Sequence, residues 1–236
     1  MAVVSSTFAP SPTFMMEHTM GRFLLLLVSS ALMAAVCAFG QSSTTSTAEG
    51  SGNGFTYGEL KVGYGVTQFG DGLSDRYEAG NFSTSGGILS SIAAYRKFDP
   101  IDHFHFGLKF KAHGAMPSNG DNNQEMFFNF WGAGISTKYF PFSATGSDGL
   151  YLQGDYFFTT QFTQKYRRTE VKEFDHQFAI GSALTLGLGY QYQLSNRYAL
   201  VATVEYDWAS RRGEVQGIGD VTFQNSNFGV QLGLVF

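Results

Sequence analysis

The stretch "NFGVQLGLVF", residues 227 to 236, alternates bulky apolar residues with mostly small or polar ones. The bulky residues all have the same parity: Phe228, Val230, Leu232, Leu234 and Phe236. Successive side chains of a strand point to opposite faces, so this period of two predicts a β-strand with one apolar face. Such a strand fits a wall that separates two different environments.

The composition of the 236-residue chain narrows the class of protein. Only 14% of the residues are charged, and a mean hydropathy of −0.08 excludes a bundle of transmembrane helices. The chain has 29 glycines, 24 phenylalanines and 12 tyrosines but 5 prolines, so its strands must tolerate glycine beside aromatic residues. A net charge of −4 without a long basic run argues against nucleic acid as a partner.

The N-terminal region has the composition of an export signal. Arg22 precedes an apolar run from Phe23 to about Ala35, and small residues follow at Ala38 and Gly40. These three parts are typical of a secretory signal peptide, and the run is too short for a membrane-spanning helix. We therefore predict three segments before the folded domain: a misassigned extension at 1–19, a signal peptide at 20–40 and a flexible leader at 41–54.

The period of two continues through the rest of the chain, residues 55–236. Seven segments separate an apolar from a small or polar face: 59–67, 104–113, 131–139, 150–161, 178–193, 198–208 and 227–236. An eighth segment, "GGILSSIAAYRKF" at 86–98, is the weakest, and its faces stay unassigned. The pattern predicts eight strands, with ten as the alternative.

The choice between a soluble sandwich and a membrane barrel rests on the polar face of these strands. In a sandwich that face meets water and is rich in lysine and glutamate. Here it carries glycine, glutamine, threonine and a few charges, a composition that fits the narrow interior of a small barrel. The apolar face is bulky and aromatic, as a lipid-facing surface requires. We predict an all-β fold, a transmembrane antiparallel up-and-down β-barrel.

The connections between the predicted strands support a barrel in a membrane. "FDPID" and "SNR" are short, whereas the polar connections at 70–86, 116–126, 163–175 and 209–221 are long. Short turns on one side and long loops on the other are typical of outer-membrane barrels. Aromatic residues near both ends of the strands predict two girdles at the membrane interfaces.

The eight alternating segments and the terminal "GVQLGLVF" resemble the small bacterial outer-membrane β-barrel superfamily. This eight-stranded group includes the OmpA transmembrane domain and OmpX-like proteins, and the resemblance covers residues 55–236. It implies location in the outer membrane and assembly with the help of periplasmic chaperones and the barrel assembly machinery. It also implies that the terminal alternation is the β-signal read by that machinery, with Phe236 as its last residue.

Charged residues on the predicted inner face suggest a network across the lumen. They fall at similar heights on three strands: Lys109, Lys111, Asp155, Glu205 and Asp207. Unpaired charges in a confined interior are costly, so we expect these residues to pair and to plug the barrel. The alternative is a narrow ion path lined by the same groups, but an eight-stranded barrel is just wide enough for side chains to fill it.

Residues that could support an enzyme or a metal site are sparse. The resemblance extends to lipid A deacylases, whose pattern of His and Ser two residues apart is not found in this chain. His103 and His105 share a strand face, but a pair of histidines is a weak metal signal. We predict no enzymatic activity, no metal site and no cofactor, and keep a lipid-modifying enzyme as the third hypothesis.

The favoured function is a monomeric structural or surface-binding barrel whose extracellular loops contact lipopolysaccharide, other cells or host molecules. In "TQKYRRTEVKEFD", residues 163–175, an aromatic residue lies among cations, which makes candidate contacts of Lys165, Tyr166, Arg167 and Arg168. A solvated segment balanced by its own acidic residues explains the same stretch. The alternative function is a narrow pore or a channel for small hydrophobic molecules.

Overall fold

The computed structural model describes residues 56–70, 86–97, 101, 103–115, 118–119, 124–167, 175–215 and 219–236. The predicted extension, signal peptide and leader lie outside these residues. In the described part of the chain, no helix is long and apolar enough to cross a membrane.

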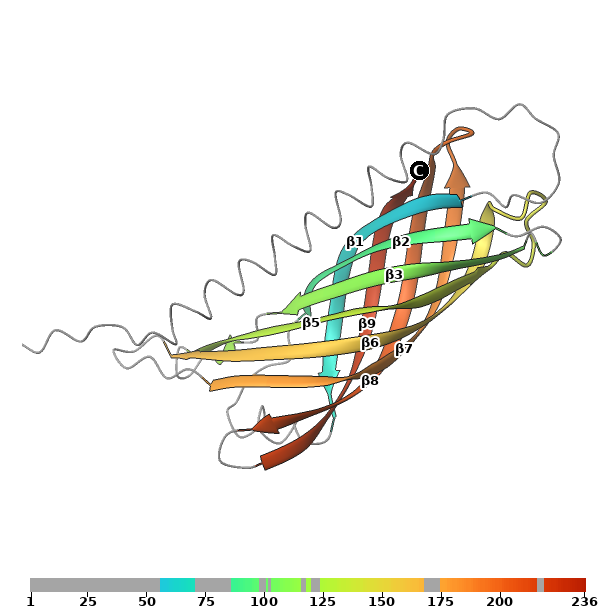
Figure 1. Cartoon of the computed structure of the whole chain (residues 1–236). Coiled ribbons are helices and arrows are strands. Elements are labelled where there is room, and N and C mark those ends of the chain that lie inside the picture. Colours follow the sequence, from blue (N-terminus) through green and yellow to red (C-terminus); the bar gives the residue numbers. More distant parts are fainter. Residues whose placement is uncertain are drawn as a thin grey trace, which may run out of the picture. The chain divides into compact units, whose positions relative to one another are not determined.

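The described residues form a closed antiparallel sheet of eight long strands (Figure 1). The strands in chain order are β1 (Thr56–Phe69), β2 (Gly86–Lys97), β3 (Phe104–Ala115), β5 (Gln124–Tyr139), β6 (Gly149–Arg167), β7 (Asp175–Gln193), β8 (Ala199–Val215) and β9 (Gly219–Val235). A two-residue strand, β4 (Ser118–Asn119), pairs only with the start of β5. The predicted all-β barrel is confirmed, with eight strands rather than ten.

Closure of the barrel takes place where the two ends of the sheet meet. β1 pairs with β9 from Glu59 opposite Val235 to Phe69 opposite Asn225, and β3 pairs directly with β5. The cyan β1 and the dark red β9 accordingly lie side by side in Figure 1. No long strand of the described sheet is left with an unpaired edge, which removes the liability of exposed N–H and C=O groups.

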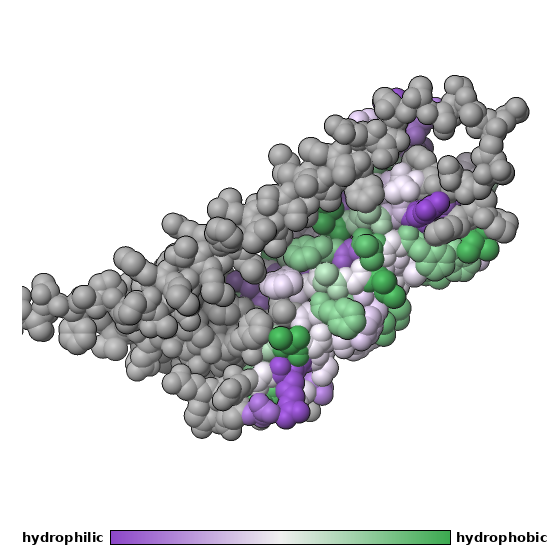
Figure 2. Space-filling model, in the orientation of Figure 1, coloured by the Kyte–Doolittle hydropathy of each residue, from purple (hydrophilic) through white to green (hydrophobic). Residues whose placement is uncertain are grey.

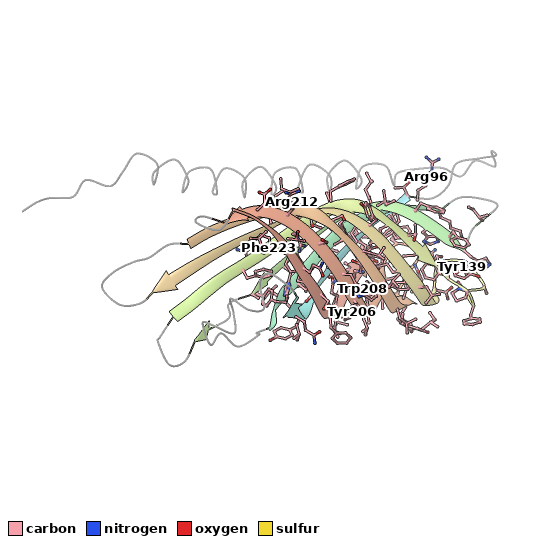
Figure 3. All side chains as sticks on the ribbon, turned by 90° about the horizontal axis from the view of Figure 1, so that it is seen from below. Arg96, Tyr139, Tyr206, Trp208, Arg212 and Phe223 are labelled. Atoms are coloured by element: carbon pink, nitrogen blue, oxygen red, sulfur yellow. The ribbon has the colours of Figure 1, made fainter. Side chains whose placement is uncertain are left out.

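The two faces of the strands are divided as the alternation predicts. Apolar side chains point outward and are exposed, for example Leu108 at 70% and Phe158 at 72%. Figure 2 shows such hydrophobic side chains gathered on the described surface. Tyr206 and Trp208 pack together on the outer side, with ring centroids 4.5 Å apart (Figure 3). The outer face of the described barrel is therefore apolar, as a surface in contact with lipid must be.

The structure assigns the faces of β2, which the sequence left open. Leu89 and Tyr95 point inward and are fully buried, whereas Ile88 is 68% exposed. Large apolar residues thus occupy both faces of this strand, which explains why its alternation is weak. Tyr95 donates to or accepts from the Ser136 hydroxyl at 2.7 Å, so its polar end is satisfied inside the barrel.

Strands extend into two of the predicted loops, 163–175 and 209–221, which corrects the sequence-based boundaries. β6 and β7 stay paired as far as Lys165 opposite Asp175, and β8 and β9 as far as Val215 opposite Gly219. These polar segments carry no clear apolar alternation. Antiparallel backbone pairing does not require an apolar face when both sides meet water, so the pattern could not show where the strands end.

The connection between β5 and β6 is a compact turn that holds itself together. Ser143 and Thr145 donate hydroxyl hydrogen bonds of 2.6 and 2.5 Å to Asp148, and Gly146 and Gly149 adopt positive φ values of 70° and 90°. These hydroxyl donors hold the pKa of Asp148 below its usual range. Local hydrogen bonds between side chains thus keep this longer turn compact.

The C-terminal residue closes the last contact between β9 and β1. Backbone hydrogen bonds of 2.8 and 2.9 Å join Phe236 and Gly58 in both directions. The Phe236 ring lies over Gly58, where an added Cβ would be 2.6 Å from it, so glycine makes room for the terminal aromatic ring. The role of Phe236 as an assembly signal stays a prediction, and the outer-membrane level of a variant lacking Phe236 tests it.

Arginine substitutions at two depths test whether the outer face meets lipid. Leu186 and Leu194 are both 53% exposed, but Leu186 lies within β7 and Leu194 in the turn that follows it. In lipid vesicles, Leu186→Arg should lower the free energy of unfolding by about 2–4 kcal/mol and Leu194→Arg by about 0–1 kcal/mol. Denaturant titration measures both values, and equal losses would show that the face does not sense membrane depth.

Candidate functional site

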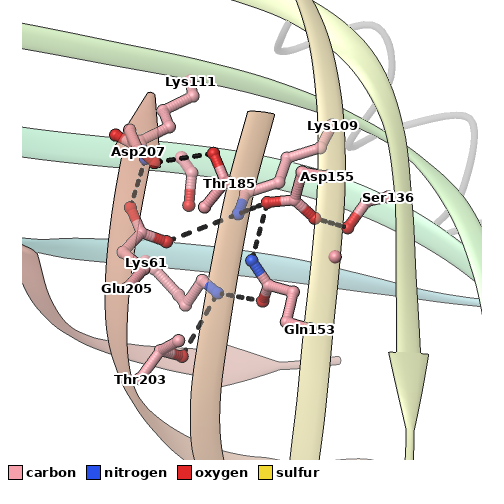
Figure 4. Close-up of polar contacts among 12 residues, drawn as sticks. Lys61, Lys109, Lys111, Ser136, Gln153, Asp155, Thr185, Thr203, Glu205 and Asp207 are labelled. Carbon is pink, nitrogen blue, oxygen red and sulfur yellow. Dashed lines mark hydrogen bonds and ion pairs between the residues drawn. The ribbon is translucent and has the colours of Figure 1, made fainter. Parts of the chain in front are cut away.

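The five charged residues predicted to share the lumen lie close together and are buried in the interior of the barrel (Figure 4). Lys109 Nζ lies 2.7 Å from Asp155 Oδ2 and 3.7 Å from Glu205 Oε2. Lys111 Nζ lies 2.6 Å from Asp207 Oδ2 and also pairs with Glu205. The contacts join β3, β6 and β8 across the interior, so each cation has a carboxylate partner from another strand.

Three further charged residues extend this network toward the turn side, and the prediction omitted them. Glu59 and Lys61 lie 3.1 Å apart on β1, and Lys138 of β5 pairs with Glu59. All three alternate with outward apolar residues in the sequence, so their inward direction could have been predicted. Parity alone does not give the height of a residue in a staggered sheet, so their membership depends on the register.

Neutral polar side chains form further hydrogen bonds with the carboxylates of the network. Gln153 and Ser136 donate to Asp155 at 2.7 and 2.5 Å, and Thr185 donates to Asp207 at 2.6 Å. Gln231 donates to Glu205 at 2.7 Å and accepts a bond of 3.0 Å from Ser91. A buried ion pair needs such additional bonds to offset the loss of water, and this cluster supplies them from most strands of the barrel.

An aromatic layer closes the lumen on the side of the short turns. Its buried members are Tyr57, Ala93, Tyr95, Phe140, Tyr151, Ala199, Val201 and Val235. The ammonium group of Lys138 lies 4.7 Å from the ring centroid of Tyr95 and 4.6 Å from that of Tyr151. Cation–π contacts of this kind stabilise a desolvated lysine, so the layer joins the charged network rather than simply capping it.

A second aromatic layer lies on the side of the long connections. Phe128 and Phe130 are buried with Ala115, and Phe69 packs edge-on against Phe128 at 4.9 Å between ring centroids. Phe223 of β9 is also fully buried, and it lies opposite Arg211 where β9 pairs with β8. The lumen is thus filled by three successive layers in the described residues: aromatic, charged and aromatic.

Three of the candidate contact residues of the sequence lie at the end of a strand. Lys165, Tyr166 and Arg167 lie at the end of β6, where their backbones pair with β5, rather than in a loop, and Arg168 lies outside the described residues. This corrects the predicted start of the loop, and the role of these residues as extracellular contacts stays a prediction. Its polar residues continue a strand because pairing with β5 is still available there.

The two histidines considered as metal ligands have other contacts. His103 Nδ1 lies 2.8 Å from the carbonyl oxygen of Phe140, and His105 Nδ1 lies 2.6 Å from the Tyr57 hydroxyl. Among the described side chains, no three His, Cys, Asp or Glu residues are arranged to hold a metal ion.

Comparison with solved structures finds small outer-membrane barrels. Neisserial surface protein A is 12% identical, with 76% of this chain and 95% of that chain covered at a TM-score of 0.46. The attachment invasion locus protein Ail of Yersinia pestis, solved with the heparin analogue sucrose octasulfate, is 9% identical, with 77% and 99% covered at a TM-score of 0.47. The outer membrane protein AlkL is 12% identical, with 82% and 95% covered at a TM-score of 0.40.

Neither the protein-family models nor the curated proteins include a match to this chain.

Removing one carboxylate tests how strongly the network stabilises the barrel. Glu205→Ala leaves Lys109 and Lys111 with one partner fewer each, so the free energy of unfolding should fall by about 3–5 kcal/mol. Denaturant titration of the refolded barrel in detergent measures this loss.

The matched control is Asp220→Ala, which breaks an exposed pair. Arg212 Nη2 lies 2.6 Å from Asp220 Oδ2, and the two side chains are 73% and 60% exposed. Solvent screens such a pair, so its removal should cost about 0–1 kcal/mol. If Glu205→Ala costs no more than this control, the interior pairs do not hold the barrel together.

Proposed function

We propose that this protein is a non-enzymatic outer-membrane barrel with a closed lumen, which acts through the parts of the chain outside the membrane. The observation that carries this proposal is the filling of the lumen by paired charges between two aromatic layers. Water and ions need a continuous polar path, and these layers leave the side chains in contact with one another instead. The apolar outer face supports the membrane location.

A conductance measurement separates a closed barrel from the alternative of a narrow pore. The refolded wild-type protein in planar bilayers should show no steady single-channel current, because Lys109 and Lys111 are held between carboxylates across the lumen. Leu186→Ala, on the outer face, should be equally silent. Stable, voltage-independent openings of the wild-type protein would refute the closed lumen and favour the pore.

We propose that the hairpin of β6 and β7 binds the partner outside the membrane. Its paired strands reach Lys165 opposite Asp175, so the hairpin has a defined backbone beyond the aromatic layer. The cations of residues 165–168 favour a polyanionic partner, and lipopolysaccharide is the one that an outer-membrane protein always meets. Pairing along both strands supports a rigid rather than an adaptable contact.

Neutralising the cations of this hairpin tests the proposed contact. Replacing Lys165, Arg167 and Arg168 with Gln should weaken binding of the refolded barrel to immobilised lipopolysaccharide and flatten its salt dependence, because the contact depends on charge. Replacing Glu170 and Glu173 with Gln in the same hairpin is the control and should not weaken binding. Unchanged lipopolysaccharide binding after loss of the three cations would exclude this hairpin as the contact.

A further inference from the structure

The described interior of the barrel holds one more cation than it has anions. The buried cations are Lys61, Lys109, Lys111, Lys138 and Arg211, and the buried anions are Glu59, Asp155, Glu205 and Asp207. Each lysine contacts a carboxylate, whereas Arg211 contacts none among the described side chains. Asp207 acts on Arg211 electrostatically, but no described carboxylate contacts its guanidinium. A buried cation without a directly bonded counter-charge is costly, so an anion is expected beside Arg211.

The guanidinium group of Arg211 has a specific part of its hydrogen-bonding capacity unused. Nη1 donates to Oδ1 of Asn225, and the ring of Phe130 lies 5.0 Å from Cζ. Nε and Nη2 are buried and have no hydrogen-bond partner. These two nitrogens carry N–H groups along the same edge of the planar guanidinium, and together they form the fork that binds two oxygens of one anion. The unused donors are therefore a matched pair.

Two other unpartnered polar groups accompany this fork. The Nδ2 atom of Asn225 is buried without a partner, as is the hydroxyl of Thr159. Register places Thr159 opposite Gly181 and Gly181 opposite Arg211. Gly181 cannot carry a side chain, because a Cβ would lie 1.9 Å from the carbonyl oxygen of Ser210. No side chain of β7 therefore comes between Thr159 and Arg211 on this row.

We propose that Arg211, Asn225 and Thr159 bind a small tetrahedral oxyanion, phosphate or sulfate, in the end of the lumen nearer the long connections. The fork takes two oxygens, and the Asn225 amide and Thr159 hydroxyl donate to the others. A carboxylate has both oxygens in one plane with the fork, whereas a tetrahedral anion directs two further oxygens out of that plane toward other donors, which favours the tetrahedral anion. The bound anion also supplies negative charge beside the one buried cation that exceeds the four buried carboxylates.

Uptake of the anion accompanies folding, because Arg211 is only 1% exposed in the closed barrel. The test therefore refolds the full chain in a phosphorus-free maltoside detergent with phosphate, and again with acetate or chloride at equal ionic strength. After desalting, phosphorus NMR and elemental analysis should find about one phosphate per wild-type barrel, a stoichiometry that follows from one fork. The midpoint of thermal unfolding should rise with phosphate or sulfate, and not with acetate or chloride, because only the folded barrel binds the anion.

Variants separate the fork from a general effect of charge. Arg211→Lys keeps the buried cation but has no fork, and its affinity for phosphate should fall about tenfold or more through lost charge-assisted bonds. Thr159→Val keeps the shape of the side chain and should weaken binding less. The matched control is Arg212→Lys, because Arg212 is next in sequence but points outward to Asp220.

The proposal predicts phosphate retention in the wild-type and Arg212→Lys proteins and its loss in Arg211→Lys. No retained phosphate in a folded wild-type barrel overturns it and indicates that a group of this chain serves the fork. Equal retention by Arg211→Lys overturns the assigned residues. An equal thermal shift with acetate overturns the choice of a tetrahedral anion.

Discussion

Pairing of β1 with β9 is the constraint on which the rest of this structure depends. In hydrocarbon each unpaired backbone N–H or C=O group costs several kcal/mol, so a sheet with an apolar outer face must close on itself. The pairing runs to the last residue, where Phe236 exchanges two backbone hydrogen bonds with Gly58. Once the sheet is closed, successive side chains of every strand point alternately to the lipid and to the lumen.

The small circumference of this closed sheet determines the chemistry of its interior. Eight strands enclose a narrow interior, so a charge that points inward must find its counter-charge within the lumen. The lysine and carboxylate groups of β1, β3, β5, β6 and β8 meet at bonding distance for this reason. Aromatic layers above and below reduce the access of water, which strengthens the pairs and makes an unpaired group more costly.

Arg211 and Arg212 show how this division of faces gives neighbouring residues different physical roles. Arg212 forms an exposed pair with Asp220, where solvent screens the charge and little stability depends on the contact. Arg211 is buried against Phe130 with two N–H groups unpartnered, so the same side chain becomes a candidate site for an anion. The two proposals agree: a closed middle layer blocks transport, and an anion binds at one end of the barrel.

The amino-acid sequence by itself determined the period of two, the apolar outer face and the inward direction of Lys109, Lys111, Asp155, Glu205 and Asp207. Parity is a local property of the strand, so a single strand is enough to read it. It did not reveal that Glu59, Lys61 and Lys138 belong to the same network. It also did not assign the faces of β2, where Ile88 and Leu89 are both apolar but point to opposite sides.

Only the tertiary structure decided which inward side chains meet and which are left alone. Lys111 and Asp207 are 96 residues apart in the chain, and their contact depends on the stagger of the strands between them. The same stagger brings Arg211 to Asn225 and Phe130 but to no carboxylate of the described interior. Stagger is set by pairing around the whole ring, so no single segment of sequence contains it.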